Sequence, residues 1–143
     1  MAAQRTAEAV WEGNLVDGSG TVSMASSGAT GEFPVTWAAR AESPEGKTSP
    51  EELMAAAHAA CYAMALSHHL AGQGRPPERL QVSVTYTFVP GTGITAADVA
   101  VRGSVPGLSA DEFEQAAKDG ELGCPVSNAV RGNVRINLTA SLD

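Results

Sequence analysis

The two cysteines are the residues of this chain with the widest choice of chemistry. Cys61 lies in the alanine-rich stretch Ala59-Ala60-Cys61-Tyr62-Ala63, and Cys124 lies far along the chain, directly before Pro125. Each is a buried apolar side chain, a metal ligand or a reactive thiol. Pro125 suits the first position of a helix, so free backbone N–H groups and the positive end of the dipole would face the Cys124 sulfur and favour its thiolate. Without a CxxC spacing, a dithiol depends on a fold that brings the two distant residues together.

The histidines offer a metal site as the alternative. His58 precedes Cys61 by three residues, so on a helix both side chains point the same way. His68 and His69 are adjacent and project about 100° apart on a helix, so they do not easily join one site. We therefore favour the absence of a metal and expect His68 and His69 near an exposed helix end.

Charged residues that flank the first cysteine matter because a thiol needs help to ionise. Arg40 ends a predicted strand and is either a solvated arginine or a partner of the thiol. A helix-start role explains Glu52, whereas Glu51 has no such role. Glu51 and Cys61 are ten residues apart, which is about 15 Å along a straight helix. Glu51 would reach the same site only through an intermediary such as an arginine, through a kink, or from a partner subunit packed antiparallel.

Length and composition limit the classes of protein to consider. The 143 residues, 43% of them hydrophobic, predict one domain over residues 1–143 with a substantial core. The formal charge of -7 provides no basic field for phosphates, so nucleic acid is not an expected partner. The N-terminal residues do not resemble a secretory signal, and no run of about 18 apolar residues occurs. We expect a cytoplasmic protein that does not enter a membrane.

The first half of the chain predicts short strands and then a long helix. Glycine-punctuated runs between Trp11 and Arg40 predict two or three strands, and Pro34 places the run Phe33–Trp37 at an edge or a strand start. Ser49-Pro50-Glu51-Glu52 has the features of a helix start, with Ser49 as N-cap and Glu52 completing a capping box. The helix then continues to about Leu70 and is apolar on nearly every face.

The second half predicts strands, two helices and a final strand. Residues 80–88 alternate strictly between apolar and polar, a weaker strand spans 98–105, and Ser109 begins a helix that Gly120 and Gly123 break. A short helix from Pro125 to about Arg131 precedes a strand over 134–141. Because strands occur in groups, the fold class is α+β. Six short strands cannot cover a long helix that is apolar all round, so a second subunit would have to cover it.

Several segments together resemble one family. Ala9-Val-Trp11-Glu-Gly13, Gly20-Thr-Val-Ser23, Ser49-Pro-Glu-Glu-Leu53, Ala56-Ala-His-Ala-Ala-Cys61 and Gly123-Cys-Pro-Val-Ser127 are similar, in order and spacing, to the osmotically inducible protein C (OsmC) family. The resemblance covers nearly the whole chain. Arg40 matches the arginine of the OsmC branch, whereas the related organic hydroperoxide resistance branch takes its arginine from the N-terminal strands, where this chain offers only Arg5.

The resemblance implies a thiol-dependent peroxidase that reduces organic hydroperoxides under osmotic or oxidative stress. It implies an intertwined homodimer, with a mostly antiparallel sheet wrapped around long central helices and active sites at the subunit interface. Cys61 would be the peroxidatic cysteine and Cys124 the resolving one, with Arg40 holding the thiolate and Glu51 anchoring Arg40. No metal, haem or flavin is implied. The reductant would be an external dithiol, either a small thiol or a lipoylated or thioredoxin-like protein.

The apolar residues of the long helix suggest where a substrate would bind. Alanines together with Met54, Met64, Leu53, Tyr62 and Phe33 would supply an apolar pocket at the dimer seam for an alkyl hydroperoxide, although residues at such spacing are more often plain core. The alternative function is a non-enzymatic ligand-binding or stress-structural protein on the same fold, in which both cysteines are buried and inert.

Overall fold

The polar, glycine-rich start of the chain and the apolar remainder form two compact units. The computed structural model describes residues 1–143, and the units are Met1–Pro50 and Glu51–Asp143.

The first unit contains a three-stranded antiparallel sheet. Its strands are β1 (Glu8–Glu12), β2 (Ser19–Ser23) and β3 (Phe33–Val35), in the order β1-β2-β3. Pro34, which has no N–H for a ladder, lies in the edge strand β3, as the sequence predicts. The prediction that strand structure continues to Arg40 is wrong, because β3 ends at Val35. Thr36 instead caps the short helix α1 (Trp37–Ala41), because its side chain accepts a hydrogen bond from the backbone N–H of Ala39 at 3.1 Å.

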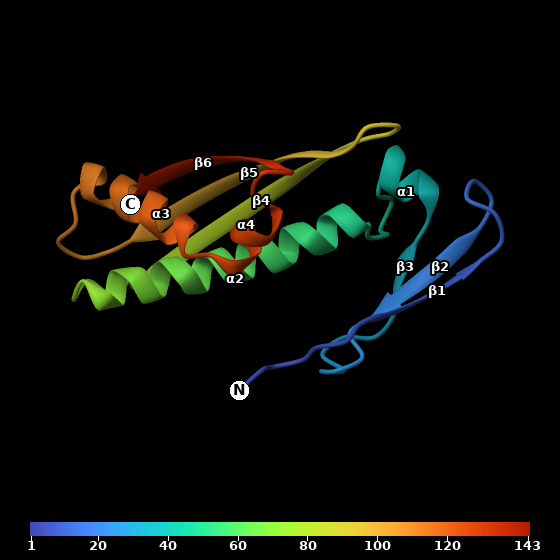
Figure 1. Cartoon of the computed structure of the whole chain (residues 1–143), viewed down its shortest axis with the longest axis horizontal. Coiled ribbons are helices and arrows are strands. Elements are labelled where there is room, and N and C mark those ends of the chain that lie inside the picture. Colours follow the sequence, from blue (N-terminus) through green and yellow to red (C-terminus); the bar gives the residue numbers. More distant parts are fainter. The chain divides into compact units, whose positions relative to one another are not determined.

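The second unit packs helices against one face of a second three-stranded sheet. Helix α2 (Pro50–Gly72) begins at the predicted proline and leads to β4 (Arg79–Val89) and β5 (Gly93–Ser104). Helices α3 (Ala110–Leu122) and α4 (Pro125–Val130) precede β6 (Arg135–Leu142). Strands β4 and β5 are antiparallel, whereas β6 lies parallel to β5 at the sheet edge, so α3 and α4 belong to the crossover between them (Figure 1). The α+β class predicted from the sequence is confirmed.

The core of this unit lies between α2, α3 and the inner face of the sheet. Tyr62, Leu66 and Leu70 of α2 are fully buried together with Phe113 of α3, and they pack against the valines of β5. The predicted capping box of α3 is present, because Ser109 and Glu112 exchange hydrogen bonds. Together these contacts fix α3, and with it the start of α4, over the sheet.

Gly120 does not break α3, contrary to the sequence prediction, and the helix continues to Leu122. Gly120 is buried at the crossing of α3 with α2, where a Cβ would lie 3.1 Å from the Cα of Leu66. The missing side chain therefore permits a close approach of two helices, and Gly123 provides the C-cap.

The side of α2 away from this core remains uncovered within the chain. Ala56, Ala57 and Ala60 are exposed and Met64 is 72% exposed, at spacings that place them on one helical face. A helix expected to be buried on all sides is thus covered on one side only. None of the helices has the length and apolar character to cross a membrane.

Candidate active site

Cys61 lies at the margin of the buried stripe of α2. His58, Tyr62, Leu66 and Leu70 form this stripe at four-residue spacings and are all buried. Cys61 is one position from the centre of the stripe, so its side chain is half-buried. Its sulfur can therefore meet both a neighbouring element and a small molecule.

Cys124 lies in the tight connection between α3 and α4. Gly123 ends α3, Cys124 is the N-cap residue of α4, and Pro125 occupies the first turn. The side chain of Cys124 makes no capping hydrogen bond. The residue is fully buried, so the thiol is held against the core.

The fold brings the two thiols into contact although 63 positions separate them. The Sγ atoms of Cys61 and Cys124 are 3.4 Å apart, and both cysteines are free. A disulfide bond measures about 2.05 Å, so these sulfurs need to approach by only about 1.4 Å to form one. The pair has the geometry of a dithiol that can be oxidised reversibly.

The surroundings of Cys61 oppose its ionisation. Burial raises the pKa of the Cys61 thiol, the neighbouring Cys124 raises it further, and a hydrogen bond from the backbone N–H of Val126 lowers it. Val126 lies in the first turn of α4, so the start of this helix faces the Cys61 sulfur. A reactive thiolate at neutral pH requires an additional positive charge.

A buried histidine, which the sequence analysis considered only as a metal ligand, lies one helical turn before Cys61. His58 Nδ1 is 2.8 Å from the hydroxyl of Tyr86, and its Nε2 is 2.7 Å from the hydroxyl of Ser127. Burial lowers the pKa of His58, while Glu121 opposes this shift. In the sequence, His58 and Ser127 each lie three residues from a cysteine, and this spacing is the only sign that they belong to the site. Only the fold shows that His58 and Ser127 contact each other.

A partly buried ion pair fixes the far end of α4. Arg131, the C-cap residue of α4, donates to Glu121 of α3 at 2.7 Å. The Glu121 side chain is only 10% exposed, so Arg131 is the partner that compensates for its burial. The pair ties the C-terminal end of α4 to α3.

The remaining predicted residues lie elsewhere along the chain. Arg40 is in the last turn of α1 in the first unit, and Glu51 is buried in the first turn of α2. Ten residues separate Glu51 from Cys61 on one continuous helix, which is about 15 Å. The roles of Arg40 and Glu51 stay predictions.

The histidines form no metal site, and one of the residues named for the apolar pocket, Tyr62, lies in the core. No group of three or more His, Cys, Asp or Glu side chains is arranged to hold a metal ion. His68 is exposed, and His69 Nε2 is 3.8 Å from Asp119 of α3. Tyr62 cannot line an open pocket, because it is fully buried and its hydroxyl donates to the carbonyl of Ala117 at 2.9 Å.

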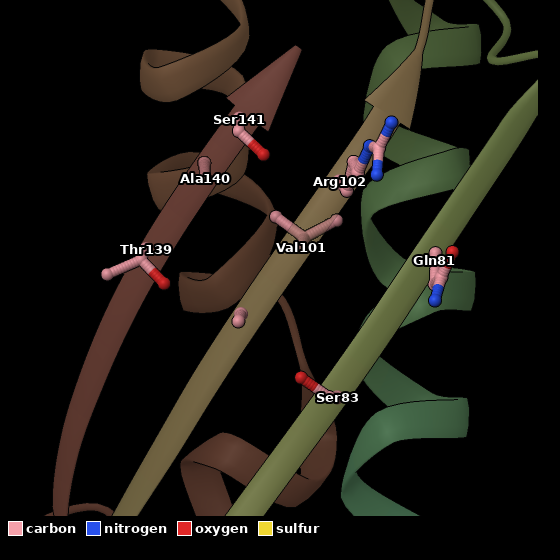
Figure 2. A pocket seen from close by; sticks show the side chains of 8 residues that line it. Gln81, Ser83, Val101, Arg102, Thr139, Ala140 and Ser141 are labelled. Atoms are coloured by element: carbon pink, nitrogen blue, oxygen red, sulfur yellow. The ribbon is translucent and has the colours of Figure 1, made fainter. Parts of the chain in front are cut away.

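The sheet also carries a hollow on its outer face. Figure 2 shows Gln81, Ser83 and Arg102 on this face, with β6 alongside. The hollow is open, has a volume of about 370 Å³ and contains neither cysteine. The two cysteines lie on the opposite, helix-covered face.

An α+β fold that holds two free thiols in contact defines a dithiol redox protein. The profile of the OsmC-like protein family matches residues 43–139. The chain is 34% identical over 140 residues, 96% of each chain, to Peroxiredoxin OsmC of Escherichia coli (strain K12). It is 37% identical over 97 residues, 64% of this chain and 66% of the relative, to an organic hydroperoxide resistance protein of Xanthomonas axonopodis pv. citri.

A solved structure has the same fold. The organic hydroperoxide resistance protein OsmC of Legionella pneumophila superimposes with a TM-score of 0.69 at 28% identity, over 98% of this chain and 99% of that one. The chain belongs to the OsmC family of thiol-dependent peroxidases, and the longer match to Peroxiredoxin OsmC assigns it to the OsmC branch. The family expectation from the sequence is confirmed.

Proposed function

We propose that this chain reduces organic hydroperoxides to alcohols with Cys61 as the attacking thiol and Cys124 as the resolving thiol. The observation that carries the proposal is the 3.4 Å contact between two free sulfurs. The assignment also agrees with the exposure of the two residues, since Cys61 is half-buried and Cys124 is fully buried. Substrate reaches the more exposed sulfur, and the buried one receives the product of the first step.

The first step is the attack of the Cys61 thiolate on the terminal oxygen of the hydroperoxide. The O–O bond breaks, the alkoxide takes a proton and leaves as the alcohol, and Cys61 becomes a sulfenic acid. The sulfur is oxidised by two electrons and the peroxide is reduced by two. No metal or organic cofactor takes part in this sequence.

The second step joins the two cysteines. The Cys124 sulfur attacks the Cys61 sulfenic sulfur, the S–O bond breaks, and the hydroxyl group leaves as water with the proton from Cys124. An external dithiol, either a small thiol or a lipoylated or thioredoxin-like protein, then reduces the disulfide and is itself oxidised. Two cysteines are too few for a disulfide scaffold, which supports a cytoplasmic location.

Arg40 is the residue we propose as the activator of Cys61. Burial raises the pKa of Cys61, and the single hydrogen bond from Val126 only partly opposes it, so a cation is needed. A guanidinium stays charged and offers several donors, so it can hold the thiolate and bind the peroxide together. Glu51 would anchor that guanidinium through paired charge and hydrogen bonds.

The active form we propose is a homodimer in which residues 1–143 act as one domain. The uncovered face of α2 supports this arrangement, because Ala56, Ala57, Ala60 and Met64 leave an apolar, slim surface on which a second α2 can pack closely. A site beside this face would be enclosed by both subunits. An apolar wall at the seam would favour alkyl hydroperoxides over hydrogen peroxide.

The test is intact-mass analysis of the reduced protein after one equivalent of cumene hydroperoxide. The wild type should lose two hydrogens, as the disulfide forms. Cys124→Ser should gain one oxygen, as the sulfenic acid persists, and Cys61→Ser should remain unchanged as the matched control. An unchanged wild-type mass would instead assign both cysteines to the inert core of a ligand-binding or structural protein.

A further inference from the structure

A chain of three polar side chains links α2, α4 and β4 beside the cysteine pair. His58 and Ser127 are both fully buried, and Tyr86 is nearly so. The imidazole lies between the two hydroxyls, 2.8 Å from Tyr86 and 2.7 Å from Ser127. The chemistry proposed above does not use any of these groups.

This cluster is fully hydrogen-bonded in the neutral state of the histidine. A neutral imidazole has one N–H donor and one lone pair, and a hydroxyl either donates or accepts. Both bonds can therefore form in either tautomer. Such a satisfied buried network fixes the relative position of the elements that it joins, because breaking it leaves unpaired polar groups in the core.

The network joins the same two helices as the cysteine contact. His58 precedes Cys61 by three residues on α2, and Ser127 follows Cys124 by three residues at the start of α4. Each hydrogen-bonding residue is thus one helical turn from a sulfur. At its other end, α4 is held to α3 by Arg131 and Glu121, so the bond from His58 secures the side that faces α2.

We propose that His58 is a positioning residue for disulfide formation, holding α4 through Ser127 so that the Cys124 sulfur stays within reach of Cys61. The inference rests on the proposed function, in which Cys124 condenses with the Cys61 sulfenic acid. The sulfurs must close from 3.4 Å to a bond length. Loss of the anchor slows this step, because rates of reactions between positioned groups fall steeply with small displacements. The attack of Cys61 on peroxide does not involve Cys124, so its rate changes little.

The chain offers a matched pair of variants for the test. Ser127→Ala removes the hydroxyl on α4, whereas Tyr86→Phe removes the hydroxyl on the other side of His58 and leaves the bond between α2 and α4. Each variant deletes one oxygen from the same buried cluster, so a purely structural role would make them behave alike. His58→Leu breaks both bonds, and in His58→Gln the amide can restore the bond to Ser127.

The two chemical steps are followed by rapid quenching and intact mass after cumene hydroperoxide. Ser127→Ala and His58→Leu should convert the sulfenic acid to the disulfide about tenfold more slowly than the wild type, while the sulfenic acid forms at nearly the wild-type rate. Tyr86→Phe and His58→Gln should retain most of the wild-type rate. In excess hydroperoxide the slow variants should accumulate Cys61 sulfinic acid, because the sulfenic acid persists.

A second assay separates this inference from the peroxidase proposal. Oxidised glutathione forms a mixed disulfide with one cysteine and releases one reduced glutathione, and the other cysteine then displaces the second. The second displacement forms the disulfide between Cys61 and Cys124, and its rate is the closure rate. If closure is slow in Ser127→Ala and fast in Tyr86→Phe while cumene hydroperoxide leaves the wild type unchanged, the positioning role of His58 is supported and the peroxidase proposal fails. Equal closure rates in the two variants and the wild type would overturn the role of His58, whatever the peroxide assay gives.

Discussion

The close packing of Gly103 in the sheet against Phe113 of α3 gives a quantitative test of the fold that supports the cysteines. A Cβ on Gly103 of β5 would lie 2.5 Å from Cζ and 2.7 Å from Cε2 of Phe113, and 3.2 Å from Leu80. Phe113 is fully buried, so its ring has no open space to enter. Overpacking of this kind lowers the free energy of unfolding by about 1–3 kcal/mol. Replacing a glycine within a strand raises it by about 0.5–1 kcal/mol, because the unfolded chain loses conformational freedom. Gly103→Ala should therefore lower the free energy of unfolding by about 1–2 kcal/mol.

The assay is urea unfolding at a fixed protein concentration, read from the transition midpoint. Gly72→Ala is the control, because Gly72 ends α2 with no atom within 4 Å of an added Cβ, and its stability should equal or slightly exceed that of the wild type. Phe113→Leu removes the ring atoms that clash, so Gly103→Ala should cost less in that background. Wild-type stability of Gly103→Ala, or the same cost with and without the Phe113 ring, would refute the packing described for β5 and α3.

Three further outcomes follow from the site and the exposed face of α2. Arg40→Met should slow sulfenic acid formation about tenfold for each unit by which the pKa of Cys61 rises. Stopped-flow measurements should show that the rate recovers at higher pH. A pH-rate profile equal to that of the wild type would remove Arg40 from the mechanism. Burial lowers the pKa of His58 below its ordinary value of 6.5, so below pH 6.5 the unfolded chain binds a proton that the folded chain does not. The free energy of unfolding should therefore fall by up to about 1.4 kcal/mol for each pH unit below 6.5. In urea titrations, His58→Gln should make this pH dependence weaker. Met64→Glu should convert the dimer to a monomer in sedimentation velocity, since Met64 is 72% exposed on the apolar face, whereas Ser83→Glu on the outer face of the sheet should not; dimers in both variants would contradict the proposed interface.

Local signals in the sequence predicted the elements whose causes are local. The proline at the start of α2, the hydroxyl and glutamate that cap α3, and the strict alternation in β4 all depend on neighbours within a few residues, and all three elements are found where expected. Helix α1 was missed because its single turn follows a strand-like run, and the cap from Thr36 is a weak signal. Gly120 was misread because its role is set by Leu66 on another helix.

The candidate site was predictable only where residue type and family pattern pointed to it. Both cysteines were singled out from the sequence, but their contact depends on the placement of α4 over α2. His58 was considered as a metal ligand, and its hydroxyl partners lie 28 and 69 positions away. No periodicity in one chain reveals such pairs, since they follow from the tertiary packing.

The parallel pairing of β5 with β6 also sets the order in which the redox pair can be assembled. The ladder joins residues 96–103 to residues 135–142, so the sheet edge closes only after the last residues of β6 have been synthesised. Helix α2 forms from local contacts and leaves the ribosome long before the segment that carries Cys124. Each new chain therefore passes through a period in which Cys61 has been synthesised and Cys124 has not, so the contact between the two thiols forms only late in the synthesis of the chain.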